Sequence, residues 1–131
     1  MSVLSGKTIA VLAEDVYEDL ELWYPYYRLL EAGAEVRIVA PELRTYQSKH
    51  GYPAKAEVEA ARAKPDDYEG VVIPGGYAPD RLRRYTAVLD LVREIFEAGD
   101  LVSSRTPADL PFYLPAIIEV LSRQGLERES R

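Results

Sequence analysis

The fold is decided by the stretch Val71-Val72-Ile73-Pro74-Gly75-Gly76-Tyr77-Ala78-Pro79-Asp80. A short apolar run that ends in a Gly pair is typical of a buried strand leading into a tight turn. Such a turn exposes backbone N–H groups, so Gly75 and Gly76 are predicted to form an oxyanion or anion cradle. The glycines also suit a strand-to-helix turn that needs positive φ angles, and the two interpretations are compatible.

Apolar strand patterns alternate with helical patterns along the rest of the chain. This alternation indicates a parallel sheet with helices on both of its faces. The expected strands are 8–13, 36–40, 70–74 and 101–104, and the first three expected helices are 18–32, 55–63 and 85–98. A last helix is expected to start after Asp109, its N-cap, and to run to about Arg123. Right-handed crossovers then give a three-layer α/β fold with a four-stranded parallel sheet of order 2-1-3-4, a flavodoxin-like arrangement without its outer strand.

The first expected helix carries an apolar stripe. Steps of three and four residues place on one face Leu20, Trp23, Tyr27 and Leu30. Gly33 follows as a C-terminal cap, and Pro25 is expected to kink or loosen the helix because it lacks an N–H donor. The helix at 85–98 likewise shows an apolar face, made by Val88, Val92 and Ile95 with Leu89 and Phe96 beside them.

Length and charge narrow the possible functions. A chain of 131 residues suits a single domain, expected to extend over residues 1–131. Its net charge of -6, from 22 acidic and 16 basic side chains, disfavours a nucleic-acid partner because phosphates need a basic face. No apolar run approaches the roughly 20 residues that span a bilayer, and no charged-then-apolar leader is seen. These features predict a soluble, cytoplasmic protein that binds neither nucleic acid nor membrane.

Three segments together resemble the DJ-1/PfpI family. The motif Glu18-Asp19-Leu20-Glu21-Leu22-Trp23-Tyr24-Pro25 follows the first strand, and Ile73-Pro74-Gly75-Gly76 ends a later one. The stretch from Leu101 to Pro111 resembles the family's last strand and the start of its last helix. The resemblance implies a class I glutamine amidotransferase-like, flavodoxin-like fold and a cysteine-dependent protease, glyoxalase or deglycase ancestry.

The segment near 99–101 looks like a join between parts that lie far apart in the family. In the family, the chain after Glu97-Ala98-Gly99 continues into a strand that ends at a Cys–His nucleophile elbow. Here the chain passes directly to Leu101, and it contains no Cys and a single His, His50. We therefore interpret the chain as a catalytically inactive, shortened domain, engineered by deletion of the block that carried the nucleophile.

The candidate site residues follow from the resemblance. Glu21 matches the family glutamate that shares a proton with the nucleophile, although an acid in the first turn also favours the helix dipole. Gly75 and Gly76 match the turn that supplies oxyanion donors. Aligning the join puts Thr106 near the position of the lost cysteine, where a hydroxyl would need a neighbouring base. His50 is expected to be a solvated loop residue, and with one His and no Cys we predict neither a metal site nor a cofactor.

Two other functions stay open. One is residual glyoxalase or hydrolase activity through Glu21 and water, and the other is a small-anion binding module at the Gly75–Gly76 turn. Aromatic residues cover more than one face of the first helix, and some of them must be exposed unless a partner covers them. The resemblance implies dimers through this region, so we predict a homodimer, for which strand or domain swapping at the bared sheet edge is one route.

Overall fold

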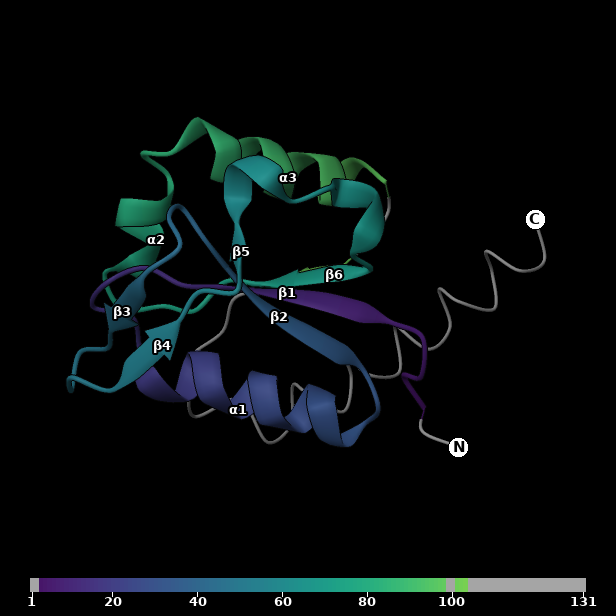
Figure 1. Cartoon of the computed structure of the whole chain (residues 1–131), viewed down its shortest axis with the longest axis horizontal. Helices are drawn as coiled ribbons and strands as arrows, with labels where there is room; N and C mark the ends of the chain where they lie inside the picture. The colour runs from purple at the N-terminus through teal and green to yellow at the C-terminus, as the bar shows by residue number, and fades with distance from the viewer. Residues whose placement is uncertain (1–2, 99–100, 104–131) are drawn as a thin grey trace.

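The computed structural model describes residues 3–98 and the backbone of residues 101–103, and they form a layered α/β arrangement (Figure 1). The central sheet has five strands, β1 (Thr8–Leu12), β2 (Glu35–Ala40), β5 (Val58–Glu59), β6 (Gly70–Val72) and β7 (Leu101–Ser103). Their order is β5-β2-β1-β6-β7 and every pairing is parallel. The predicted order 2-1-3-4 is therefore confirmed for β2, β1, β6 and β7, and β5 adds a strand beside β2.

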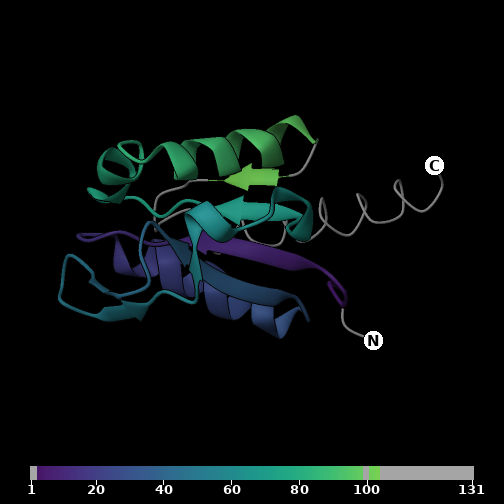
Figure 2. The same ribbon diagram turned by 45° about the horizontal axis from the view of Figure 1, so that its top comes forward.

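Helices cover both faces of this sheet. The helix α1 (Asp19–Glu31) lies on one face, and α2 (Ala78–Leu82) and α3 (Thr86–Glu97) lie on the other (Figure 1). In Figure 2, β7 lies next to β6 beneath α3, as the pairing of Val71 with Val102 requires. Since β1 is sandwiched between the layers, its residues from Ile9 to Leu12 are at most 1% exposed. This explains why the sequence of β1 is a continuous apolar run.

The α1 helix turns its apolar stripe outward. Its buried positions are Glu21, Leu22, Pro25 and Leu29, whereas Leu20 and Tyr27 of the predicted stripe are 54% and 59% exposed. The helix runs through Pro25 without interruption. Its end agrees with the prediction, because Gly33 follows the C-cap with a φ of 98°, a conformation that favours glycine.

The predicted helix at 55–63 is wrong. This segment holds the end of β4 (Pro53–Lys55), then β5 and a single 3-10 turn at Ala60–Arg62. The Glu57 N–H donates to the Ile38 carbonyl at 2.8 Å, and Val58 pairs with Val39. Pairing with β2 therefore overrides a helix propensity that is worth only tenths of a kcal/mol per residue. β4 also forms a separate antiparallel hairpin with β3 (Thr45–Gln47), which the sequence analysis did not predict.

The predicted helix at 85–98 is confirmed as α3. It buries Val88, Leu91 and Ile95, while Leu89 and Phe96 are 49% and 68% exposed. The expected strand at 101–104 is present as β7, and the expected last helix and Thr106 lie outside the described residues.

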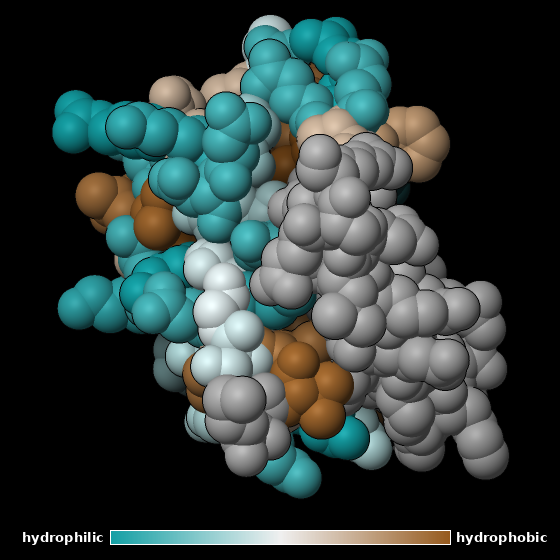
Figure 3. Space-filling view, turned by 90° about the vertical axis from the view of Figure 1, so that its right-hand side faces the viewer, coloured by the Kyte–Doolittle hydropathy of each residue, from teal (hydrophilic) through white to brown (hydrophobic). Residues whose placement is uncertain are grey.

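All pairings in the central sheet are parallel, so its strands begin at one end and finish at the other. Figure 3 shows the end at which the strands begin, where the described surface is largely hydrophilic with smaller apolar patches. The candidate site lies at the opposite end, where β1 and β6 lead into their following loops. None of the helices within residues 3–98 is long and apolar enough to cross a bilayer.

Candidate functional site

The start of α1 and the turn after β6 meet in a partly buried contact. The Gly75 N–H donates to Glu21 Oε1 at 2.7 Å. Glu21 is the third residue of α1, and it lies on the buried side of the helix, where it is only 6% exposed. The structure thus brings together two of the predicted site residues, a carboxyl group and a turn amide.

The turn is also fixed to the loop that precedes α1. Gly75 O accepts from the Glu18 N–H at 3.2 Å, and Tyr77 N–H donates to Val16 O at 3.0 Å. Val16 itself has a φ of 62°, which is uncommon and strained for a β-branched residue. Strained backbone persists where its surroundings fix it, and it is concentrated at functional sites.

Both positions of the turn require glycine. A Cβ on Gly75 would overlap Glu21 Oε1, so only glycine allows the carboxylate to approach the amide. Gly76 has a φ of 75°, and a Cβ there would lie 2.6 Å from Val16 O. Gly75 is therefore required by a close approach alone, whereas Gly76 is required by both a close approach and a positive φ. The Gly75 amide is already used by Glu21.

Burial sets the protonation of this site. Burial raises the pKa of Glu21 above its usual value, and Glu18 adds to this effect, while the bond from Gly75 and the charge of Lys49 oppose it. A carboxyl group with a raised pKa keeps its proton to a higher pH than a free glutamate does, which favours its use as a proton donor or acceptor. The Glu21–Gly75 pair can thus act in acid–base chemistry.

A second polar cluster lies beside the site and was missed from the sequence. Ser48 Oγ donates to Asp19 Oδ2 at 2.6 Å, and His50 Nδ1 lies 2.8 Å from Asp19 Oδ1. Although burial alone would raise the pKa of Asp19, the bonds from Ser48 and His50 lower it. The His50 side chain is 74% exposed, as expected for a loop residue, and it contacts Asp19 rather than the Gly75–Gly76 turn. Its bond to Asp19 links positions 31 residues apart, which no local pattern reveals.

Buried aromatic side chains support the same loops. Tyr17 is fully buried, donates its hydroxyl to Tyr52 O at 2.8 Å and accepts from Trp23 Nε1 at 2.9 Å. The segment at Tyr17 bridges to Ser48 on one side and to Gly76 on the other. Tyr17 therefore holds the site turn and the loop before β4 at a fixed spacing.

The other predicted groups are the Thr106 hydroxyl and the absence of a metal site. Thr106 lies outside the described residues. Within the part of the chain that the structure describes, no group of three His, Cys, Asp or Glu side chains could hold a metal ion. The sequence has no thiol, and among the predicted site residues that the structure describes Glu21 is the one with a titratable side chain.

Comparison with known proteins identifies the relatives of the chain. A model of the DJ-1/PfpI family matches residues 7–119. A deglycase of Pyrococcus horikoshii and the deglycase PfpI of Pyrococcus furiosus are each 38% identical over 96 residues, or 73% of this chain. An uncharacterised protein of Archaeoglobus fulgidus is also 38% identical over 96 residues. The chain spans less than three fifths of these relatives, 57% or 58% of their length.

Solved structures agree with this result. A two-domain protein of Anabaena variabilis with DJ-1/ThiJ/PfpI-like and ferritin-like domains superposes with a TM-score of 0.74 at 31% identity, covering 85% of this chain and 32% of that one. DJ-1 of Toxoplasma gondii superposes with a TM-score of 0.71 at 21% identity, covering 89% of this chain and 61% of that one, and supports the fold alone.

Proposed function

Because the chain belongs to the DJ-1/PfpI family, we propose that it is a catalytically inactive, shortened member derived from a cysteine-dependent deglycase, glyoxalase or protease. One observation carries the proposal. The Glu21–Gly75 half of a site is intact, yet none of the 131 residues is a cysteine. A buried carboxyl group can move a proton, but it does not replace the thiolate that attacks a substrate carbonyl.

The position of the shortening also supports this proposal. α3 ends at Glu97 and β7 begins at Leu101, so a join near 99–101 leaves both elements whole. The family model nevertheless matches on both sides of this join, from residue 7 to residue 119. A cut between complete elements favours deliberate excision over gradual decay, and we infer an engineered deletion of the segment that carried the nucleophile.

Residual activity through Glu21 is the second candidate, and the raised pKa of its buried carboxyl group favours it. Glu21 would act as a general base on water, a role that contributes about 10²–10⁴-fold in rate when geometry is good. Thr106 as nucleophile would add to this mechanism only if a base lay within hydrogen-bond reach.

Anion binding at the turn is a third candidate, and it competes with Glu21. The Gly75 N–H already donates to Glu21 Oε1, so an anion at this amide would have to displace the carboxyl group. An anion that raises the melting temperature of the Glu21→Ala variant more than that of the unaltered chain would support such a module.

We also propose a homodimer formed through the outer face of α1. On this face Leu20, Tyr24 and Tyr27 are 54%, 38% and 59% exposed, and Arg28 and Glu31 lie beside them. A stripe of this kind, rimmed by one cation and one anion, suits a self-complementary contact. A light-scattering mass equal to one chain would refute it. A cytoplasmic location belongs to the same proposal, and cell fractionation would test it.

The test of inactivity is methylglyoxal consumption, with the deglycase PfpI of Pyrococcus furiosus as the active reference. We expect neither the chain nor its Glu21→Gln variant to consume methylglyoxal. If the chain consumed methylglyoxal and Glu21→Gln abolished this activity, the proposal of an inactive scaffold would be wrong and residual enzyme activity through Glu21 would be supported.

A further inference from the structure

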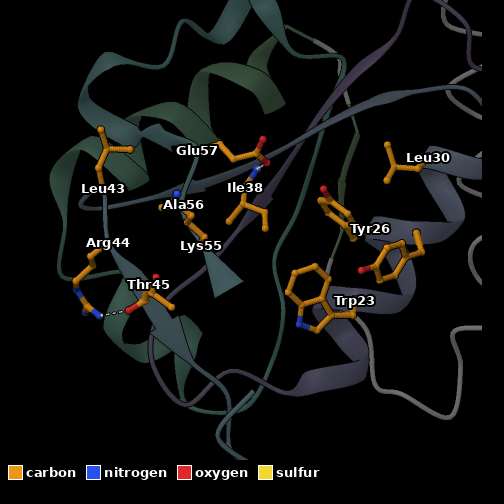
Figure 4. Close-up of a pocket in the computed structure, with 11 residues that line it drawn as sticks. Trp23, Tyr26, Leu30, Ile38, Leu43, Arg44, Thr45, Lys55, Ala56 and Glu57 are labelled. Carbon is orange, nitrogen blue, oxygen red and sulfur yellow. Dashed lines mark hydrogen bonds between the residues drawn. The ribbon is translucent and has the colours of Figure 1, made fainter. Parts of the chain in front are cut away.

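Each face of the sheet carries a hollow. The wider one lies between α1 and the β3–β4 hairpin, and Trp23, Tyr26 and Leu30 line it on the α1 side (Figure 4). Its lining also includes Tyr27, which belongs to the proposed dimer contact of α1, so this hollow is part of a surface already assigned. The other hollow lies between α2 and α3, which cover the opposite face of the sheet (Figure 1).

This α2–α3 hollow reaches from the surface to the buried core. Its volume is about 380 Å³. Leu12 of β1, Leu82 of α2 and Val88 of α3 line it, and all three are buried. Leu89 and Phe96 of α3 also line it, and both are exposed. A hollow of this size with apolar walls falls within the range of sites for small molecules, about 300–1,000 Å³.

The lining of the α2–α3 hollow indicates a ligand with a hydrocarbon body. Apart from Arg83 and Arg93, every described residue that lines the hollow has an apolar side chain. A peptide or a sugar carries polar groups along its whole length, and burying such groups without hydrogen-bond partners is unfavourable. An alkyl chain has no such groups, and it gains free energy in proportion to the apolar surface that leaves water.

The two arginines of the lining can bind an anionic head group. Arg83 Nη2 lies 3.2 Å from Asp80 Oδ1, and Arg93 Nη2 lies 2.9 Å from Asp90 Oδ1. All four side chains are exposed, and exposed ion pairs of this kind contribute little. A guanidinium group has five N–H donors, so each arginine can keep its aspartate and donate to a further carboxylate as well.

The local charge around the α2–α3 hollow is opposite to that of the whole chain. The stretch from Tyr77 to Arg93 contains four arginines and two aspartates, a net charge of +2, whereas the chain as a whole carries -6. An anion is therefore attracted to this stretch and repelled by the rest of the surface. A cation of the same shape would meet the opposite preference.

We propose that the α2–α3 hollow binds a free aliphatic carboxylate, a single unbranched alkyl chain with an ionised head group. The chain enters between Leu89 and Phe96 and is buried against Leu12 and Val88. The carboxylate stays at the surface, where the guanidinium groups of the lining donate to it. This site uses neither Glu21 nor the Gly75–Gly76 turn, so it is independent of the proposed function.

Titration of the full chain, labelled with nitrogen-15 and followed by two-dimensional NMR, tests the proposal. The probe is octanoate, and the matched controls are octylammonium, which reverses the charge, and hexanoate, which shortens the chain. The amide signals of Leu89 and Val92 should move in a saturable way, and that of Leu29 on α1 should not. Octylammonium should bind at least tenfold more weakly. Hexanoate should bind about fifteenfold more weakly, because each buried CH₂ group contributes about fourfold.

Substitution of single arginines tests where the head group binds. Arg83→Gln and Arg93→Gln should each reduce the preference for octanoate over octylammonium at least threefold. Both side chains are exposed, so the variants should fold, and circular dichroism checks this. Arg84→Gln is the matched control, because Arg84 is an exposed arginine of the same stretch that is not among the residues lining the hollow. It should leave the preference unchanged apart from a small loss that salt removes.

Three results would overturn the proposal. Equal affinities for octanoate and octylammonium would show that the arginines do not select the ligand, and equal affinities for octanoate and hexanoate would show that no alkyl chain is buried. An oligomeric mass that Phe96→Ser lowers and Tyr27→Ser does not would show that a second copy covers the hollow. A mass that only Tyr27→Ser lowers would fit the dimer contact on α1 and leave the hollow open to the carboxylate.

Discussion

The contact between Glu21 and Gly75 predicts an unusual response to a single methyl group. In Gly75→Ala the new Cβ would overlap Glu21 Oε1, and the three nearest atoms to it all belong to Glu21. Gly75 does not have a positive φ, so alanine suits its backbone. The whole penalty therefore comes from the displaced carboxyl group.

The magnitude follows from two opposing effects. Loss of a hydrogen bond to a charged or buried polar group costs about 1.5–3 kcal/mol. Replacing a glycine by alanine without strain returns about 0.4–1 kcal/mol through the unfolded state. We expect Gly75→Ala to lower the free energy of unfolding by about 1–2 kcal/mol in the unaltered chain.

The sign should reverse once Glu21 is removed. In a Glu21→Ala background nothing but ordinary contacts surrounds the new methyl, so Gly75→Ala should stabilise by about 0.4–1 kcal/mol. Gly51→Ala is the matched control, because Gly51 has a φ of 82° with no atom within 4 Å of its Cβ. Its effect should be the same in both backgrounds, as expected for independent sites.

Urea unfolding followed by circular dichroism measures all six proteins, namely each single variant, the two doubles and the parent. If Gly75→Ala destabilised equally with and without Glu21, the carboxylate would not be what requires glycine at this position. The reasoning about the turn would then be refuted.

Three further predictions concern protonation and packing. Because the folded-state pKa of Glu21 is raised, its stabilising contribution is present below pH 4.5 and is lost as the pH rises through the folded pKa. Glu21→Gln should therefore gain stability relative to the parent over that pH range, as measured by urea unfolding at a series of pH values. The pKa of Asp19 is lowered, so its contribution to the free energy of unfolding is present above pH 3.8 and is lost as the pH falls through the folded pKa. Asp19→Asn should remove this part of the loss of stability in acid. An unchanged loss of stability in acid would contradict the prediction. Ile95→Ala should cost about 2–5 kcal/mol, because Ile95 is fully buried, whereas Phe96→Ala on the exposed side should cost far less, and equal losses would show that α3 is oriented otherwise.

Regular elements could be predicted where one signal dominated. The apolar runs at 8–13 and 70–74 became the buried strands β1 and β6, and their order followed from crossover handedness. The segment at 55–63 was predicted wrongly, because pairing of Val58 with Val39 depends on residues far away in sequence. Helical periodicity also identified the stripe on α1 without revealing which side is buried.

The candidate site was predictable to a similar extent. Family motifs pointed to Glu21, Gly75 and Gly76, and the structure joins Glu21 to the turn. The Asp19–His50 contact could not be foreseen, since an exposed histidine in a loop carries no local signature of a partner 31 residues away.

Under the proposed function, this chain is a folded scaffold that lacks the nucleophile segment expected from the family resemblance. The most direct measurement compares methylglyoxal consumption by the purified chain with that of a version in which a Cys–His elbow segment is inserted at the join near 99–101. The account predicts turnover only by the restored version, and its Glu21→Gln variant should then lose activity. Turnover by the chain as it stands, at a rate that Glu21→Gln abolishes, would contradict the account.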